Sequence, residues 1–126
     1  MEMKQIIEKY LAGLQAGNYE EIIKLFSAEA QVHSPLYGKV KAGKFYTDLF
    51  NDTSKSTITL RNILLNQDNP SVGAGHFRYD WIMKDGTPTS FECVDIFNID
   101  QSGKIEKLTI IYDTASTTRQ AFANLK

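Results

Sequence analysis

The segment from Thr89 to Asp113 constrains the fold more than any other part of the chain. It consists of two β-patterned runs on either side of Asp100-Gln101-Ser102-Gly103, a cluster of turn-forming residues that ends in Gly. The segment therefore predicts a long antiparallel hairpin. In its first run, strict alternation puts five side chains on one face of the strand: Phe91, Cys93, Asp95, Phe97 and Ile99. Asp95 thus lies in the middle of an apolar row.

The length of the turn decides which residues of the second run share the face of Asp95. A four-residue loop pairs Ile99 with Lys104. It brings three apolar residues to that face: Leu108, Ile110 and Tyr112. A three-residue loop shifts the register by one and brings a different set: Lys107, Thr109 and Ile111. The four-residue loop is favoured because it places apolar residues opposite apolar residues.

A carboxyl group on an apolar face has to be hydrogen-bonded, paired with a cation or protonated, because burying an isolated charge is prohibitive. Two interpretations of Asp95 follow. It accepts a structural hydrogen bond from a neighbouring Tyr or a backbone N–H, or it belongs to a binding or catalytic site. Carboxyl groups with perturbed pKa values occur at both kinds of place.

Composition excludes several classes of function. The 126 residues suffice for one domain with a sizeable core. The net charge of −1 gives no basic surface for a nucleic acid. No apolar run is long enough for a signal peptide or a membrane span, so no membrane partner and a cytoplasmic location are expected. We find no Gly-rich phosphate loop and no nucleophile elbow.

Metal and cofactor chemistry also has no support in the sequence. Cys93 is the single cysteine, which excludes an intrachain disulfide and a cysteine-based metal site. His33 is expected at the surface or rim, and His76 on a solvated strand face with Arg78 and Asp80. Neither histidine has ligand-type neighbours at a metal-binding spacing. We therefore expect neither a metal nor a cofactor.

The first part of the chain predicts helices. Apolar residues recur at helical spacing within residues 4–16, and Gly17 ends this helix. Asn18 and Glu21 form a capping-box pattern for a second helix, with Phe26 on its apolar face.

The period of the pattern then changes from 3.6 to 2. Asp85-Gly86 predicts a two-residue hairpin turn. The other expected elements follow in this order: an extended piece at 30–34, a loop through Gly38 and Gly43, a third helix ending near Asn51, strands at 57–66 and 73–84, and a tail helix at 114–126 capped by Asp113 or Thr114. Helices followed by long antiparallel strands describe one α+β domain over residues 1–126, in which helices cover one face of a curved sheet.

Three segments together resemble a known family. They are residues 10–26 (YLAGLQAGNYEEIIKLF), 30–38 (AQVHSPLYG) and 94–105 (VDIFNIDQSGKI). Their order and spacing resemble the nuclear-transport-factor-2-like superfamily, in particular its SnoaL-like and ketosteroid-isomerase-like branch. The resemblance implies a cone-shaped domain in which a curved antiparallel sheet wraps over three N-terminal helices around a pocket. It also implies a homodimer.

The resemblance assigns roles to three residues. In the ketosteroid-isomerase-like pattern, Tyr10 and Asp95 stand where the two donors of the oxyanion hole stand, and such enzymes keep the acid neutral in an apolar site. Ser34 stands where those enzymes have their general base, an Asp. A hydroxyl does not accept a proton near neutral pH unless another base activates it. Whether the protein is an enzyme is therefore left open.

The leading hypothesis is a pocket that binds a small, mostly apolar molecule whose carbonyl or phenol oxygen is held by Tyr10 and Asp95. Isomerase- or cyclase-type proton chemistry is one version of it. The alternative is a non-catalytic ligand-binding or dimerisation module, and an adaptor acting through the outer sheet face is a third interpretation. Tyr37 and Trp81 are assigned either to the pocket wall or to a dimer contact. The other expected lining residues are Ser34, Phe91, Cys93, Leu108, Ile110 and Tyr112.

Overall fold

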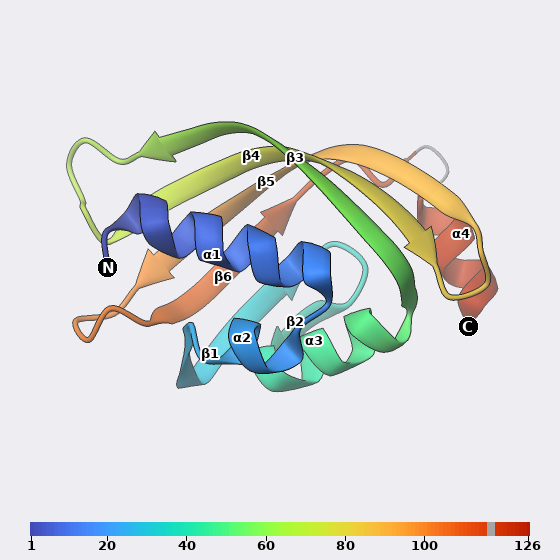
Figure 1. Cartoon of the computed structure of the whole chain (residues 1–126), viewed down its shortest axis with the longest axis horizontal. Helices are drawn as coiled ribbons and strands as arrows, with labels where there is room; N and C mark the ends of the chain where they lie inside the picture. The colour runs from blue at the N-terminus through green and yellow to red at the C-terminus, as the bar shows by residue number, and fades with distance from the viewer. Residues whose placement is uncertain (116–117) are drawn as a thin grey trace.

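The computed structural model describes residues 1–115 and 118–126 (Figure 1). The helices are α1 (Met3–Ala16), α2 (Tyr19–Ile23), α3 (Ala42–Asn51) and α4 (Thr118–Leu125). The strands are β1 (Phe26–Ser34), β2 (Gly38–Lys41), β3 (Thr53–Leu65), β4 (Val72–Met83), β5 (Pro88–Ile99) and β6 (Ile105–Ile111).

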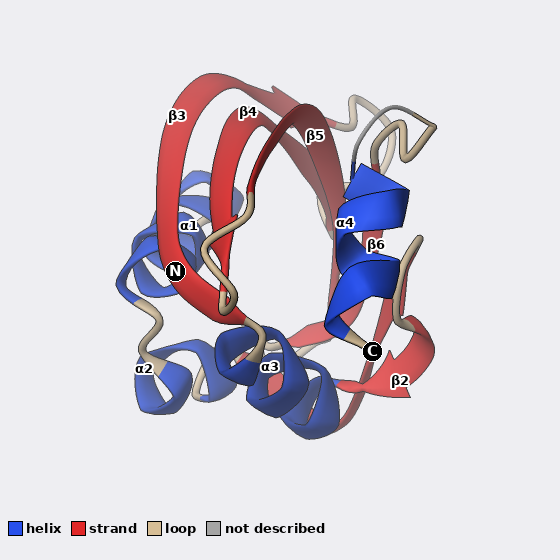
Figure 2. Cartoon of the chain, turned by 90° about the vertical axis from the view of Figure 1, so that its right-hand side faces the viewer, coloured by secondary structure: helices blue, strands red, loops and turns tan. Residues whose placement is uncertain are grey.

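These strands form one six-stranded sheet in the order β2-β1-β6-β5-β4-β3. Strands β3 to β6 form the predicted antiparallel meander. The β1–β2 hairpin extends it, because β1 pairs with β6 in parallel. The long strands curve around the helices, as Figure 2 shows along the open end of the fold. The predicted α+β domain with a curved sheet over N-terminal helices is confirmed.

Helix α1 forms as its sequence predicts. Its apolar stripe is buried against β3 and β4 and consists of Ile6, Ile7, Tyr10, Leu11 and Leu14. Gly17 ends the helix at φ +66°, a left-handed conformation that Gly adopts without a Cβ penalty. Asn18 then caps α2, since its side-chain oxygen accepts the N–H of Glu21 at 3.2 Å.

We expect Asn18→Ala to lower the free energy of unfolding by about 1 kcal/mol, because the first turn of α2 loses the acceptor for one of its free N–H groups. Urea unfolding measures this change. Asn51→Ala is the matched control, because Asn51 is an exposed residue at the end of α3. Equal losses in the two variants would contradict a capping role for Asn18.

Two expectations in the first half of the chain were wrong. Phe26 does not extend the apolar face of α2, which ends at Ile23. It begins β1, pairs with Ile105 and is buried. The expected loop through Gly38 instead contains β2, which pairs with β1. In both places pairing with a distant or neighbouring strand overrides the local pattern.

The β5–β6 register confirms the predicted face but not the predicted turn pairing. Ile99 pairs with Ile105, not with Lys104. A bulge then places one extra residue, Glu106, on β6, because the next pair joins Asn98 to Lys107. The extra residue restores the parity, so that Asp95 pairs with Ile110. The apolar residues of β6 therefore share the face of Asp95, as expected.

Two smaller differences concern the second half of the chain. Asp85-Gly86 turns the chain within a three-residue connection, since the N–H of Met83 donates to the carbonyl of Thr87 at 2.9 Å. Helix α4 is described from Thr118, while residues 116 and 117 of the expected tail helix lie outside the described residues. Asp113, one of the expected caps, accepts the N–H of Ala115 at 2.8 Å.

Two glycines of β4 bring α1 close to one end of the sheet. A Cβ on Gly73 would lie 2.6 Å from Cγ of Met3, and a Cβ on Gly75 would lie 3.1 Å from Cγ2 of Ile7. A Cβ at position 73 would clash with Met3, and one at position 75 would crowd Ile7, so Gly favours this close approach. The inner face of β4 continues with three large aromatic residues: Phe77, Tyr79 and Trp81. The helix therefore packs tightly at one end of the sheet, and a cavity is left at the other.

Candidate functional site

The cavity lies among α1, α3, the β1–β2 turn and the concave face of β4 to β6. Most of its wall is aromatic: Tyr10, Tyr37, Phe45, Phe77, Tyr79, Trp81, Phe91 and Tyr112. The other lining residues are Leu14, Leu49, Ile110, Ser34, Cys93 and Asp95. The cavity has a volume of about 30 Å³ for the centres of water molecules. This is enough for about two waters. The cavity is therefore narrow and mostly aromatic.

The structure brings seven of the eight proposed site residues to the cavity wall: Tyr10, Ser34, Phe91, Cys93, Asp95, Ile110 and Tyr112. Leu108 is the exception and is fully buried in the core. It pairs with Phe97 on one side and with Val32 on the other. Leu108 lies nearer the β5–β6 turn than the Asp95–Ile110 pair does, and there the core is filled.

Tyr37 and Trp81, whose place the sequence left open, both lie in the cavity wall rather than on the outer sheet face. Sequence reasoning did not assign five other lining residues: Leu14, Phe45, Leu49, Phe77 and Tyr79. Each belongs to an apolar stripe that the sequence shows. Such a stripe predicts burial, but it does not tell a packed core from the wall of a cavity.

Among the described residues, Asp95 is the only one that brings a carboxyl group to the cavity wall. It is 1% exposed, and its Oδ1 accepts a hydrogen bond from Sγ of Cys93 at 3.2 Å. Within 1–115 and 118–126, no Lys, Arg or His lines the cavity. Burial raises the pKa of Asp95 to about 7, and the Cys93 thiol opposes part of this rise. Near neutral pH, Asp95 is thus present in both protonated and ionised forms.

Tyr10 is positioned by a second tyrosine that the sequence did not single out as a site residue. The hydroxyl of Tyr46 donates to the hydroxyl oxygen of Tyr10 at 2.8 Å, and both side chains are buried. Burial raises the pKa of each phenol well above its ordinary value, so both stay protonated. Tyr10 accepts from Tyr46 and keeps its own proton to donate. The sequence could have indicated Tyr46, because a Tyr on a buried helix face needs a hydrogen-bond partner.

Several other polar groups of the wall serve the fold. Oγ of Ser34 accepts the N–H groups of Leu36 and Tyr37, at 3.2 and 3.1 Å, and so shapes the β1–β2 turn. The Tyr79 hydroxyl is hydrogen-bonded to Ser56 at 2.7 Å, and Nε1 of Trp81 donates to Thr53 at 2.8 Å. Asp95, Tyr10 and Tyr112 are therefore the polar residues of the wall best placed to contact a ligand.

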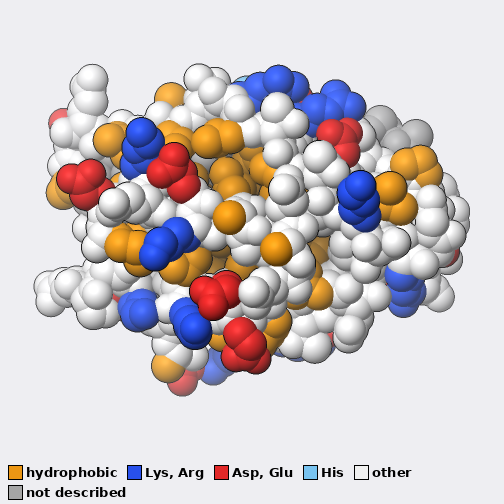
Figure 3. All heavy atoms as spheres, in the orientation of Figure 1, with side chains coloured by type: hydrophobic (Ala, Val, Ile, Leu, Met, Phe, Trp, Pro, Cys, Tyr) orange, Lys and Arg blue, Asp and Glu red, His pale blue; other side chains and the backbone are white. Residues whose placement is uncertain are grey.

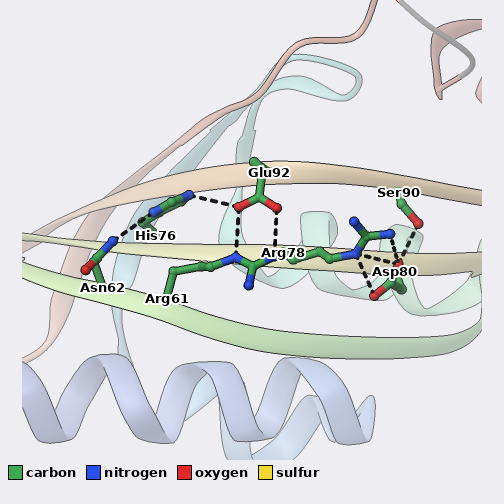
Figure 4. A network of polar contacts seen from close by, with 7 residues as sticks. All are labelled: Arg61, Asn62, His76, Arg78, Asp80, Ser90 and Glu92. Carbon is green, nitrogen blue, oxygen red and sulfur yellow. Dashed lines mark hydrogen bonds and ion pairs between the residues drawn. The ribbon is translucent and has the colours of Figure 1, made fainter.

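Both histidines lie away from the cavity. His76 lies on the convex face of the sheet, where Nε2 is 3.0 Å from Glu92 and Nδ1 is 3.2 Å from Asn62 (Figure 4). Arg61 binds the same Glu92 carboxylate from β3. His33 is half-buried between Lys39 and Thr109, as its pairing shows. Partial burial and the neighbouring Lys107 and Lys39 lower its pKa.

Side chains of the metal-ligating types do not cluster in the described residues. None of their His, Cys, Asp and Glu side chains form a group of three or more that could hold a metal ion. Acidic and basic side chains are interspersed on the face that Figure 3 shows. Within 1–115 and 118–126, no helix is long and apolar enough to cross a membrane.

A curved sheet over N-terminal helices around an aromatic cavity defines a protein of the nuclear-transport-factor-2-like class. The chain belongs to the SnoaL-like domain family, whose profile matches residues 7–108. The predicted superfamily is thereby confirmed. No curated protein matches the sequence.

Several solved structures have the same fold. One is a hypothetical protein with a ketosteroid isomerase-like fold from Catenulispora acidiphila, in complex with trimethylamine (TM-score 0.75, 13% identity, covering 88% of this chain and 87% of that one). Another is AclR, a putative hydroxylase from Streptomyces galilaeus (TM-score 0.74, 12% identity, 95% of each chain). A third is SalBIII, an epoxide hydrolase/cyclase-like enzyme of pyran ring formation in the polyether salinomycin (TM-score 0.72, 18% identity, 87% and 89%). At these identities the likeness concerns the fold.

Proposed function

We propose that the protein binds a small, mostly apolar molecule with a carbonyl or phenol oxygen, and that Asp95 exchanges a proton with it. The observation that carries the proposal is a buried carboxyl group, with a pKa of about 7, in the wall of an aromatic cavity that Tyr10 also lines. A protonated Asp95 and Tyr10 both donate hydrogen bonds, which suits an oxygen acceptor. An anionic ligand is disfavoured, because no cationic side chain lines the cavity.

Asp95 itself supplies the base that Ser34 does not. A group whose pKa lies near the working pH can both accept and donate a proton. The ionised Asp95 takes a proton from the carbon next to a carbonyl group, and the carbonyl oxygen gains negative charge. Tyr10, supported by Tyr46, donates to that oxygen and stabilises the charge. Asp95 then returns the proton to a carbon of the same molecule, so the step is an isomerisation with no net oxidation.

Proteins described as enzymes occur among those that share the fold. SalBIII, which shares the fold, is described as epoxide hydrolase/cyclase-like. The alternative is a binding module without catalysis, and the engagement of Ser34 in the β1–β2 turn favours it. The two versions differ in whether a bound ketone loses a proton.

Cyclohexanone in D₂O separates them. We expect the protein to accelerate exchange of the ketone's α-hydrogens for deuterium, measured by NMR. Asp95→Asn should lose this acceleration by about 100-fold or more, and Tyr10→Phe should reduce it by roughly 100-fold. Glu106→Gln is the matched control, because it removes an exposed carboxylate at the β6 bulge. Chemical-shift changes at cavity residues report binding separately.

Saturable binding without faster exchange would support the binding module and overturn the catalytic version. Absence of both binding and exchange would overturn the proposal as a whole. The pH dependence adds a further check. Because a ketone oxygen requires a donor, its affinity should fall as pH rises through about 7, the pKa of Asp95. An affinity for the ketone that rises over that range would contradict the donor role of protonated Asp95.

A further inference from the structure

We infer that Tyr37 is the movable part of the cavity wall, and that its contacts with Phe45 and Phe122, together with the Lys126–Asp52 ion pair, hold it closed. Part of the wall has to move because the cavity is smaller than the ligand. The cavity has room for about two waters, which is less than a ring-sized ligand requires. The ligand is that of the proposed function, but the gate is a property of the fold and is tested without a ligand.

Most of the cavity wall is fixed by backbone structure. Its residues on β4 and β5 lie in strands that are hydrogen-bonded on both sides. Helix α1 is fixed by its close packing on Gly73 and Gly75. Tyr37 differs, because it lies in the turn between β1 and β2, and β2 is an edge strand. The wall at Tyr37 is therefore the part that moves with the least loss of backbone hydrogen bonds.

Side chains rather than the sheet hold Tyr37 in place. Its hydroxyl donates to Oδ2 of Asp52 at 2.7 Å. Its ring packs edge-on against Phe45 of α3, with ring centroids 5.3 Å apart, and against Phe122 of α4, at 4.9 Å. In Figure 2, α4 stands in front of β6, and its C-terminal end is directed towards α3. It thus supports the cavity wall through its contact with Tyr37.

Asp52 joins the two helices. Its side chain is 4% exposed, and it contacts Nζ of Lys126 at 2.8 Å and Nζ of Lys84 at 3.2 Å. Burial alone would raise the pKa of Asp52, but its hydrogen bonds with Lys126, Tyr37 and Lys84 bring the pKa below its ordinary value. The carboxylate is therefore ionised at neutral pH. Lys126 also lies 5.2 Å from the Phe122 ring centroid, so one ammonium group holds the end of α4 to Asp52.

The opposite end of α4 has an anchor that does not depend on charge. The hydroxyls of Thr118 and Thr89 are 2.6 Å apart, and both residues are buried. When Lys126 leaves Asp52, α4 can tilt about its Thr118 end without leaving the protein. Tyr37 then loses Phe122 as a support. Because Lys126 is half exposed, salt should weaken the contact and favour opening.

Cys93 provides a built-in reporter of opening. It is the single cysteine, lies in the cavity wall and is 2% exposed. Iodoacetamide reaches it only when the cavity opens, and mass spectrometry measures the rate. We expect Lys126→Met to react at least tenfold faster than the wild type. The wild-type rate should rise with salt, whereas the Lys126→Met rate should not.

Two controls keep the test decisive. Lys9→Met removes an exposed ammonium group from α1 and should react at the wild-type rate. Asn18→Ala lowers stability without touching the gate, so it measures how much labelling comes from global unfolding. If Lys126→Met reacts no faster than the wild type, or no faster than Asn18→Ala at equal stability, the gate is overturned. That result leaves cyclohexanone binding to be judged on its own, and a failure to bind cyclohexanone leaves the labelling rates valid.

Discussion

Asp95→Asn is expected to make the protein more stable at pH 8 while it removes the proton chemistry. The carboxyl pKa rises from 3.8 to about 7 on folding. At 1.36 kcal/mol for each pKa unit, the ionised form at pH 8 destabilises the folded state by on the order of 4 kcal/mol. Asparagine carries no charge and avoids this cost. Desolvation of its amide group will offset part of the gain, by about 1–3 kcal/mol.

The sign of the pH dependence follows from linkage. The folded state binds the Asp95 proton more tightly than the unfolded state, so this group's contribution to stability is complete below pH 3.8. It decreases as pH rises and is lost above about 7. The wild type should therefore lose stability between pH 5 and pH 8 relative to Asp95→Asn. Urea unfolding at both pH values measures the difference. A constant gap between the two proteins would contradict the raised pKa.

The effect of Asp95 on stability also distinguishes its structural interpretation from its site interpretation. A structural carboxyl should stabilise the fold through strong hydrogen bonds, yet the bond seen here comes from a thiol, which is a weak donor. A carboxyl group that destabilises the fold at neutral pH is typical of a functional site, where stability and activity conflict. The geometry therefore favours the site interpretation.

The sequence predicts the burial of Asp95 well, because its evidence is local. Alternation along β5 assigns each side chain to a face, and the apolar residues of β6 select the register. Phe26 and β2 were missed for the opposite reason. Phe26 begins β1, whose parallel partner β6 is distant in the sequence. Strand β2 pairs with the neighbouring β1, but its four residues are mostly exposed and show no apolar alternation. Parallel pairing between distant segments is a tertiary property.

The sequence also does not show where the cavity lies. Phe91 and Leu108 belong to the same predicted face, yet Phe91 lines the cavity and Leu108 fills the core. Alternation gives the face of a residue but not how closely the opposite layer approaches it. That distance depends on Gly73 and Gly75, which let α1 settle against one end of the sheet. The concave face of the sheet is therefore filled by packed side chains at one end and borders the cavity at the other.

Phe97→Ala tests the packing at the filled end of the concave face, and it should lower the free energy of unfolding by about 3–5 kcal/mol. Phe97 is fully buried, and its ring packs edge-on against Tyr10 with centroids 5.2 Å apart. Its removal leaves a void in a region without spare space. Urea unfolding at pH 5, where Asp95 is mostly protonated, isolates this packing effect from ionisation.

Phe91→Ala is the matched comparison, because Phe91 and Phe97 lie on one face of β5. Phe91 is only partly buried, borders the cavity and stacks on Tyr112 at 3.9 Å. Its ring already has empty space on one side, so we expect a loss of about 1–2 kcal/mol, below the usual cost of a Phe→Ala change in a packed core. The enlarged cavity should discriminate less between cyclohexanone and ketones of other sizes. Equal losses at the two positions would mean that the cavity is filled in solution, and the ligand site on Asp95 would have no room.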